Sequence, residues 1–172
     1  MQDLINILNT STITLKLPSN LWESFDTSLR KTVSANNWHT FRYLTDDDNL
    51  SPQIMNISNI KGGIYIFYAS PEIIPARQRI LFYVGRALLT KNQNLRKRIT
   101  EYYMYYKNND WERPKINEMF EHWGPYLYCS YIELDDNTLI EQLEAELINK
   151  LLPPFNASIP NKKISKAVRA LL

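Results

Sequence analysis

The chain has 172 residues, of which 44% are hydrophobic and 22% are charged. This length suits one domain, or one domain with a modest appendage, and the composition excludes a disordered tail or a fibrous repeat. The single cysteine, Cys129, excludes an internal disulfide, and with only two histidines a structural zinc site is nearly excluded too. A bound metal would therefore be a hard cation held by carboxylate.

The sequence has no apolar run long enough to span a membrane, and its first ten residues lack the basic start and cleavage site of a signal peptide. These features predict a cytoplasmic protein with no membrane partner.

The net charge of +2 is unevenly distributed along the chain. Residues 61–100 carry eight basic groups against Glu72 alone, residues 101–149 carry three against eleven acids, and residues 150–172 carry five basic groups and no acid. Segregation of this kind predicts a surface that faces a polyanion. A solvated basic face is the alternative interpretation.

Residues 1–60 are predicted to form an N-terminal accessory region with a strand and a helix. Ile13, Leu15 and Leu17 alternate with polar residues as in a strand, and 21–33 reads as an amphipathic helix capped by Ser19 and Asn20. The polar stretch 46–59, with three aspartates and Pro52, predicts a connector.

The core is predicted at 61–157 and a basic C-terminal helix at 158–172. Within the core, β-rich runs separated by a proline-containing loop indicate an antiparallel strand pair, and two helices, a third strand and a long helix stopped by two prolines follow. The predicted strands are 63–69, 80–85 and 125–134, and the predicted helices are 94–107, 114–123 and 137–152. The fold class is therefore α/β (α+β), with a short antiparallel or mixed sheet of about three strands flanked by helices.

Two long helices carry polar residues where apolar ones are expected. At ~100° per residue, Glu144 falls at roughly 40° from Ile140, inside the apolar arc of its helix. Arg98 lies at the border of the apolar arc of residues 94–107, and Tyr102 stacks one turn away. A carboxylate on a buried face is costly unless it is paired or binds a cation. A structural ion-pair network and a functional site are both consistent with this pattern.

Three of the four glycines, Gly62, Gly63 and Gly85, frame two tyrosine-bearing strands, and five short elements then occur in order. They are Gly63-Ile64-Tyr65, Tyr83-Val84-Gly85, Leu95-Arg96-Lys97-Arg98 with Tyr102, Glu144, and Pro153-Pro154-Phe155-Asn156. Together they resemble the GIY-YIG nuclease domain across residues 62–156. That superfamily includes the N-terminal nuclease domain of the bacterial excision-repair incision enzyme, intron homing endonucleases and some Type II restriction enzymes.

The resemblance implies a set of catalytic residues and a cofactor. Glu144 would be the only protein ligand of one Mg²⁺ (or Mn²⁺), Arg98 would clamp the scissile phosphate, and Asn156 would tie the site together. Either Tyr65 or Tyr83 would be the general base, and Tyr102 would orient the phosphate or a water. The implied catalytic set is Tyr65, Tyr83, Arg98, Tyr102, Glu144 and Asn156.

Basic residues beside this site are predicted to contact DNA, namely Arg86, Lys91, Arg96 and Lys97. The expected function is a metal-dependent DNA endonuclease, of restriction type and site-specific, with a homodimer as the arrangement for double-strand cutting. A structure-specific repair or mobile-element nuclease of the same fold, and a non-catalytic DNA-binding module, are the alternatives. The chain departs from the usual pattern in the seventeen residues between Tyr65 and Tyr83, which are more than the family's usual ten or so.

Overall fold

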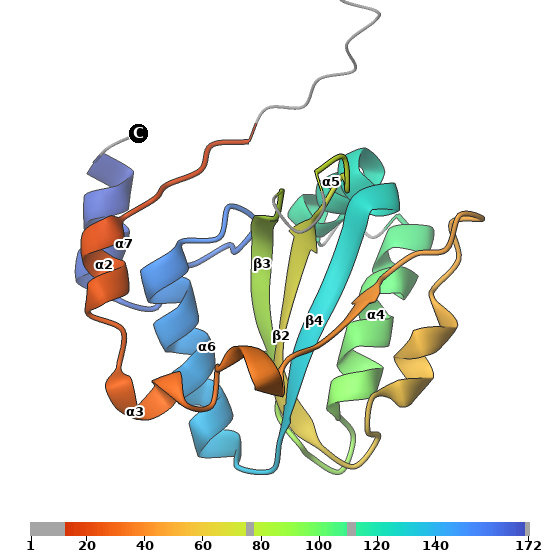
Figure 1. The fold of residues 1–172 in the computed structure, drawn as a ribbon, viewed down its shortest axis with the longest axis horizontal. Coiled ribbons are helices and arrows are strands. Elements are labelled where there is room, and N and C mark those ends of the chain that lie inside the picture. The colour runs from red at the N-terminus through yellow and green to blue at the C-terminus, as the bar shows by residue number, and fades with distance from the viewer. Residues whose placement is uncertain (1–12, 75–77, 110–112, 171–172) are drawn as a thin grey trace, which may run out of the picture.

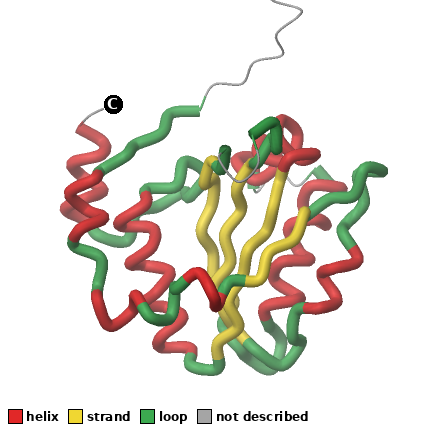
Figure 2. The backbone as a smooth tube through the Cα atoms, viewed as in Figure 1, coloured by secondary structure: helices red, strands yellow, loops and turns green. Residues whose placement is uncertain are grey.

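The computed structural model describes residues 13–74, 78–109 and 113–170. The start of the predicted accessory region, the centre of the loop between the first two predicted strands and the last two residues of the predicted C-terminal helix lie outside these ranges. Figure 1 shows a sheet between helices, and Figure 2 shows the same arrangement as a tube. In chain order the elements are α2 (Ser19–Glu23), α3 (Thr27–Arg30), η1 (Ala35–Asn37), β1 (His39–Arg42), η2 (Pro52–Asn56), β2 (Gly62–Ala69), β3 (Ile80–Ala87), α4 (Leu95–Lys107), α5 (Pro114–Trp123), η3 (Gly124–Tyr126), β4 (Leu127–Leu134), α6 (Asn137–Leu151) and α7 (Lys162–Ala170).

The described sheet has four strands in the order β1-β4-β2-β3, and every neighbouring pair is antiparallel. The mixed α and β fold class is confirmed, but the prediction of about three strands is wrong because it missed β1. This strand has only four residues, and Phe41 is its one buried side chain. It is a strand because its backbone pairs with β4, where Phe41 lies opposite Cys129. Because β4 is distant in sequence, the four residues of β1 carry no local pattern that predicts a strand.

Alternation along the strands builds two hydrophobic layers, one on each face of the sheet. On one face, Tyr65 and Phe67 of β2 pack with Leu95 of α4 and Phe120 of α5. On the other face, Ile64 of β2 and Val84 of β3 pack with the apolar side of α6. Figure 1 shows α4 and α6 on opposite sides of the sheet. Residues at neighbouring positions of β2 and β3 therefore point toward different helices.

The three helices α4, α5 and α6 confirm the predicted ones to within a residue at each end. Asn94 caps α4, since its side chain accepts a hydrogen bond from the Lys97 amide, and Asp136 caps α6 through the amides of Thr138 and Leu139. Helix α6 ends at Leu151, and the next residue, Leu152, has a positive φ of 47° and precedes Pro153. No helix of the described ranges is long and apolar enough to cross a membrane.

The N-terminal predictions need correction. No strand forms among the described residues from Ile13 to Leu17, and the side chains of Leu15 and Leu17 are exposed. The strand of the N-terminal region that joins the sheet is β1, which pairs with β4. The predicted helix over 21–33 is two short helices, α2 and α3. Asp26 separates them because its side chain accepts from the Ser28 and Leu29 amides and starts α3 as an N-cap.

Candidate active site

A cleft of about 350 Å³ opens at the side of the sheet where β2 and β3 lie between α4 and α6. Four elements contribute side chains to it, and we call it the tyrosine cleft. It is lined by Tyr65, Tyr83, Arg86, Ala87, Leu88, Thr90, Gln93, Arg98 and Glu144. Five of the predicted functional residues, Tyr65, Tyr83, Arg86, Arg98 and Glu144, are therefore on its walls.

Gly85 makes room for one wall of this cleft. Tyr65 lies opposite Gly85 in the β2–β3 register, and a Cβ atom at position 85 would lie 2.5 Å from both Cζ and Oη of Tyr65. Any larger residue would displace the phenol. The position of the Tyr65 side chain therefore requires a glycine at position 85.

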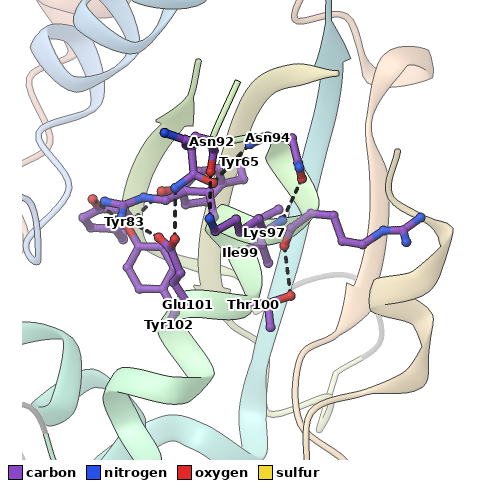
Figure 3. Close-up of polar contacts among 12 residues, drawn as sticks. Tyr65, Tyr83, Asn92, Asn94, Lys97, Ile99, Thr100, Glu101 and Tyr102 are labelled. Carbon is purple, nitrogen blue, oxygen red and sulfur yellow. Dashed lines mark hydrogen bonds and ion pairs between the residues drawn. The ribbon is translucent and has the colours of Figure 1, made fainter. Parts of the chain in front are cut away.

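Three phenols form a hydrogen-bonded chain at the cleft, two on its wall and one behind them. The hydroxyl of Tyr102 lies 2.8 Å from that of Tyr65 and donates to the hydroxyl of Tyr83 at 3.1 Å. Figure 3 shows the three side chains converging from β2, β3 and α4. Tyr65 and Tyr102 are almost fully buried, whereas Tyr83 is half-buried. Tyr102 is not part of the cleft lining, so it contacts the other two phenols from behind.

Burial fixes the protonation state of these phenols. It raises the pKa of Tyr65, Tyr83 and Tyr102 well above the ordinary value of 10, and the nearby charge of Arg98 opposes this rise only in part. All three are neutral at pH 7. Since Tyr83 accepts the Tyr102 proton, its own proton is free to point into the cleft.

Arg98 is held in place by a carboxylate that the sequence reasoning missed. Its Nη1 lies 2.9 Å from Oε2 of Glu101, and its guanidinium stands 5.4 Å from the ring centroid of Tyr102. Gln93 donates to the other oxygen of Glu101 at 3.0 Å. Glu101 is three residues after Arg98 on the same helix, and side chains at this spacing meet on one side of a helix. The Arg98–Glu101 pair could therefore have been predicted from this spacing in the sequence. Arg98 is also part of the cleft lining.

Glu144 makes its closest contact with Arg86. Arg86 Nη1 lies 2.5 Å from Oε2 of Glu144, and Nη2 lies 3.5 Å from Oε1 of Glu141. Burial raises the pKa of Glu144 above its ordinary value, and the positive charge of Arg86 lowers it in part. Arg86, predicted to contact DNA, is in this structure the counterion of Glu144.

Asn156 lies along the edge of β3, the strand that carries Tyr83. Its Oδ1 accepts from the Val84 amide at 3.0 Å and its Nδ2 donates to the Val84 carbonyl at 2.8 Å. The Phe155 amide also donates to the Phe82 carbonyl at 3.0 Å. Asn156 does not line the tyrosine cleft. Its contacts dock the segment after α6 onto β3.

The other predicted DNA contacts are not part of the lining of the tyrosine cleft. The Arg96 guanidinium donates to the carbonyls of Ile57 at 2.6 Å and Met55 at 3.0 Å, so it holds η2 against α4. The Lys97 ammonium donates to the Asn92 carbonyl at 2.7 Å, as Figure 3 shows. Lys91 is exposed on the loop before α4. The cleft lining includes none of these three residues.

The donor set of the cleft can be tested against the predicted cation. In the described ranges no group of three or more His, Cys, Asp or Glu side chains could hold a metal ion. Glu144 is the one carboxylate in the cleft lining, with Glu141 on the far side of Arg86. This set fits a Mg²⁺ ion that keeps most of its waters, provided that Arg86 releases Glu144.

Comparison of the chain with family models, with curated proteins and with solved structures finds no match.

Proposed function

We propose that the protein is a metal-dependent DNA endonuclease whose active site is the tyrosine cleft. One observation carries the proposal. Two phenols, an arginine and a half-buried carboxylate, contributed by β2, β3, α4 and α6, line a single cleft although they are spread over 80 residues of sequence. Without Arg86 or a cation beside it, a carboxylate whose charge burial disfavours would cost stability.

Arg98 is suited to hold the phosphate to be cleaved. Its guanidinium is planar, always charged and oriented by Glu101 and the Tyr102 ring. A donor fixed before substrate arrives loses little entropy when it binds, and its charge stabilises the negative charge that builds up on the phosphate oxygens. Arg86 would move from Glu144 to a second phosphate oxygen when DNA enters the cleft.

The tyrosines act first as neutral hydrogen-bond donors. Their raised pKa values make phenolate scarce at pH 7, so the chain by itself does not supply a phenolate base. The Tyr83 proton, which the bond from Tyr102 does not use, can donate to a phosphate oxygen or position a water. Tyr65 and Tyr102 keep Tyr83 in this orientation.

Glu144 would hold the divalent cation. When bound, such an ion supplies stabilisation of phosphate charge and a water of lowered pKa. The carboxylate lies on the side of α6 that faces the sheet, near Arg86 of β3. Arg98 and Glu144 are both in the cleft lining, which leaves the space between them for the phosphate.

Within the nuclease class we favour a site-specific enzyme of restriction type that cuts as a homodimer. A structure-specific repair or mobile-element nuclease uses the same residues. A non-catalytic DNA-binding module is the second candidate, and the direct Arg86–Glu144 pair at 2.5 Å favours it, because the pair neutralises the carboxylate without a cation.

The deciding experiment is cleavage of supercoiled plasmid DNA in Mg²⁺ or Mn²⁺, with EDTA as the metal-free arm. Glu144→Gln should lower the cleavage rate by about 10³-fold, the scale expected for removing one charge-stabilising group. Glu146→Gln is the matched control, since Glu146 is on the same helix and pairs with Lys150 outside the cleft. Cutting that persists undiminished in Glu144→Gln would remove the proposed metal role. Binding without cutting of any DNA form would favour the binding module.

A further inference from the structure

Helix α7 carries a line of basic side chains that the tyrosine cleft does not use. Lys162, Lys163, Lys166 and Arg169 fall within an arc of roughly 120° on the helix, and all four are exposed. We call these four residues the basic stripe. Within the described residues none of the four side chains takes part in an ion pair or a side-chain hydrogen bond. They differ in this from Arg96 and Lys97, whose charged groups bind backbone carbonyls of the same chain.

The position of α7 is fixed by its first turn. Asn149 of α6 accepts a hydrogen bond from the Asn161 amide at 2.9 Å, and the Asn161 side chain in turn accepts from the amides of Lys163 and Ile164. Figure 1 shows α7 on the outer side of α6. The stripe is therefore attached to the helix that carries Glu144.

The opposite side of α7 faces the body of the protein. Ser165 and Val168 border a cleft of about 460 Å³ whose other walls include Ile148 of α6 and Leu152, the residue after this helix. Arg169 of the basic stripe also borders this cleft, so the stripe and the cleft meet at that residue. Lys16 and Lys115 add two more cations to this cleft, against one carboxylate, Glu118. We call it the C-terminal cleft. Because Ile164 and Val168 are half-buried on this inner side, only the basic side of α7 faces solvent.

The C-terminal cleft lies close to the proposed active site. Ile148 and Leu152 follow Glu144 on or at the end of α6 by four and eight residues, which is ~6 and ~12 Å along the helix axis at 1.5 Å per residue. DNA advances 3.4 Å per nucleotide of one strand, so this distance is roughly two to four nucleotides. Asn156 borders the C-terminal cleft and also binds Val84, the neighbour of Tyr83.

We propose that the basic stripe, with Lys16 and Lys115 of the C-terminal cleft, binds the phosphate backbone of DNA next to the cleavage site. The proposal rests on the proposed function, because it places the stripe beside a strand held in the tyrosine cleft. A membrane is the other polyanion that a basic helix could meet. A helix that lies in a membrane inserts its apolar side, and in α7 that side faces the protein.

The test compares two variants with the same total charge. Lys162→Gln, Lys163→Gln, Lys166→Gln and Arg169→Gln together lower the formal net charge from +2 to −2. The control replaces Lys31, Arg42, Lys61 and Lys107, four basic residues on other elements and loops, also by Gln. Circular dichroism checks that both variants fold. Affinity for a fluorescein-labelled DNA duplex is measured by anisotropy in EDTA, which prevents cutting, between about 50 and 200 mM salt.

The stripe variant should bind DNA about 100-fold more weakly at low salt, and the slope of log K against log salt should fall by about three. The control variant should change the slope by less than about one. A slope unchanged in the stripe variant, or an equal drop in the control, would overturn the proposal. So would stripe-dependent binding to phosphatidylserine vesicles with unchanged DNA affinity.

Plasmid cleavage by the same variants separates this inference from the proposed function. Stripe-dependent DNA binding by a wild-type protein that never cuts would refute the nuclease and leave the stripe as a DNA-binding surface. Cutting combined with stripe-independent affinity would refute the stripe alone.

Discussion

The two walls of the tyrosine cleft are built on different principles. On the α4 wall, Arg98 is tied to Glu101 and stacked on Tyr102, and the phenols bond to one another. On the α6 wall, Glu144 has a single strong partner, Arg86, whose side chain is 36% exposed. Several contacts hold the first wall in place, whereas the second depends on one contact whose arginine is partly exposed to water.

The difference suggests that the two walls have different roles in binding. A preorganised wall recognises charge without rearranging, and a wall held by one exchangeable ion pair can take up a cation only after that pair opens. DNA phosphate would draw Arg86 away and free Glu144, so substrate and cation would bind with positive coupling. Variants of each wall should therefore fail in different ways.

The largest effect is expected on the α4 wall. Arg98→Ala should lower the plasmid cleavage rate by about 10³-fold, since it removes a fixed charge from the phosphate site, and Arg98→Lys should recover only part of it because the ammonium lacks the planar fork. Lys107→Gln, on the same helix but paired with Asp48, is the control. Equal activity of the lysine variant and wild type would mean that the fixed geometry of this wall is unimportant.

An intermediate effect is expected on the α6 wall without DNA. Arg86→Gln should tighten Mn²⁺ binding by about fivefold, because it removes a partly exposed competing ion pair worth ~1 kcal/mol. Isothermal titration calorimetry measures this directly, with Lys61→Gln as the control at a distant pair. A Mn²⁺ affinity lower than or equal to that of wild type would show that Arg86 does not compete with the cation at Glu144.

The smallest effect concerns stability and pH. Burial raises the folded-state pKa of Glu144 above its ordinary 4.5, so the folded protein binds this proton more tightly than the unfolded chain does. Its ionisation therefore lowers stability as pH rises through the interval from 4.5 to the raised pKa. Glu144→Gln should raise the melting temperature at pH 7, and the gain should vanish below pH 4.5. A lower melting temperature at pH 7 would show that the Arg86 pair outweighs the burial cost.

The central part of the fold was predictable because its signals are local. The two tyrosine-bearing strands are runs of β-branched and aromatic residues, α4 and α6 have capping residues and apolar arcs, and Pro153 marks the end of α6. The N-terminal part lacks such signals. β1 depends on pairing with β4, and Asp26 divides a helical pattern because its side chain caps the second helix. Hydrophobic periodicity alone does not show whether a helix continues or is interrupted by a local cap.

The site was predictable where spacing along one element decides geometry. The position of Glu144 on the inner side of α6 follows from helical periodicity. The partners of the basic residues did not follow, since Arg96 binds carbonyls some forty residues earlier in the chain and Arg86 meets a carboxylate 58 residues later. A long basic side chain can bind groups that are distant in sequence, and the residues next to it in the sequence do not indicate which group it will bind.

Asn156 has a consequence for aggregation as well as for the site. β3 is an edge strand, and unpaired amides and carbonyls at a sheet edge are templates for pairing with another chain. The carboxamide of Asn156 occupies both polar groups of Val84 as a peptide group of a fifth strand would. With the Phe155 amide on the Phe82 carbonyl, this segment closes the sheet edge beside Tyr83. Replacing Asn156 by alanine would expose that edge, and the variant should form intermolecular β-structure more readily than wild type.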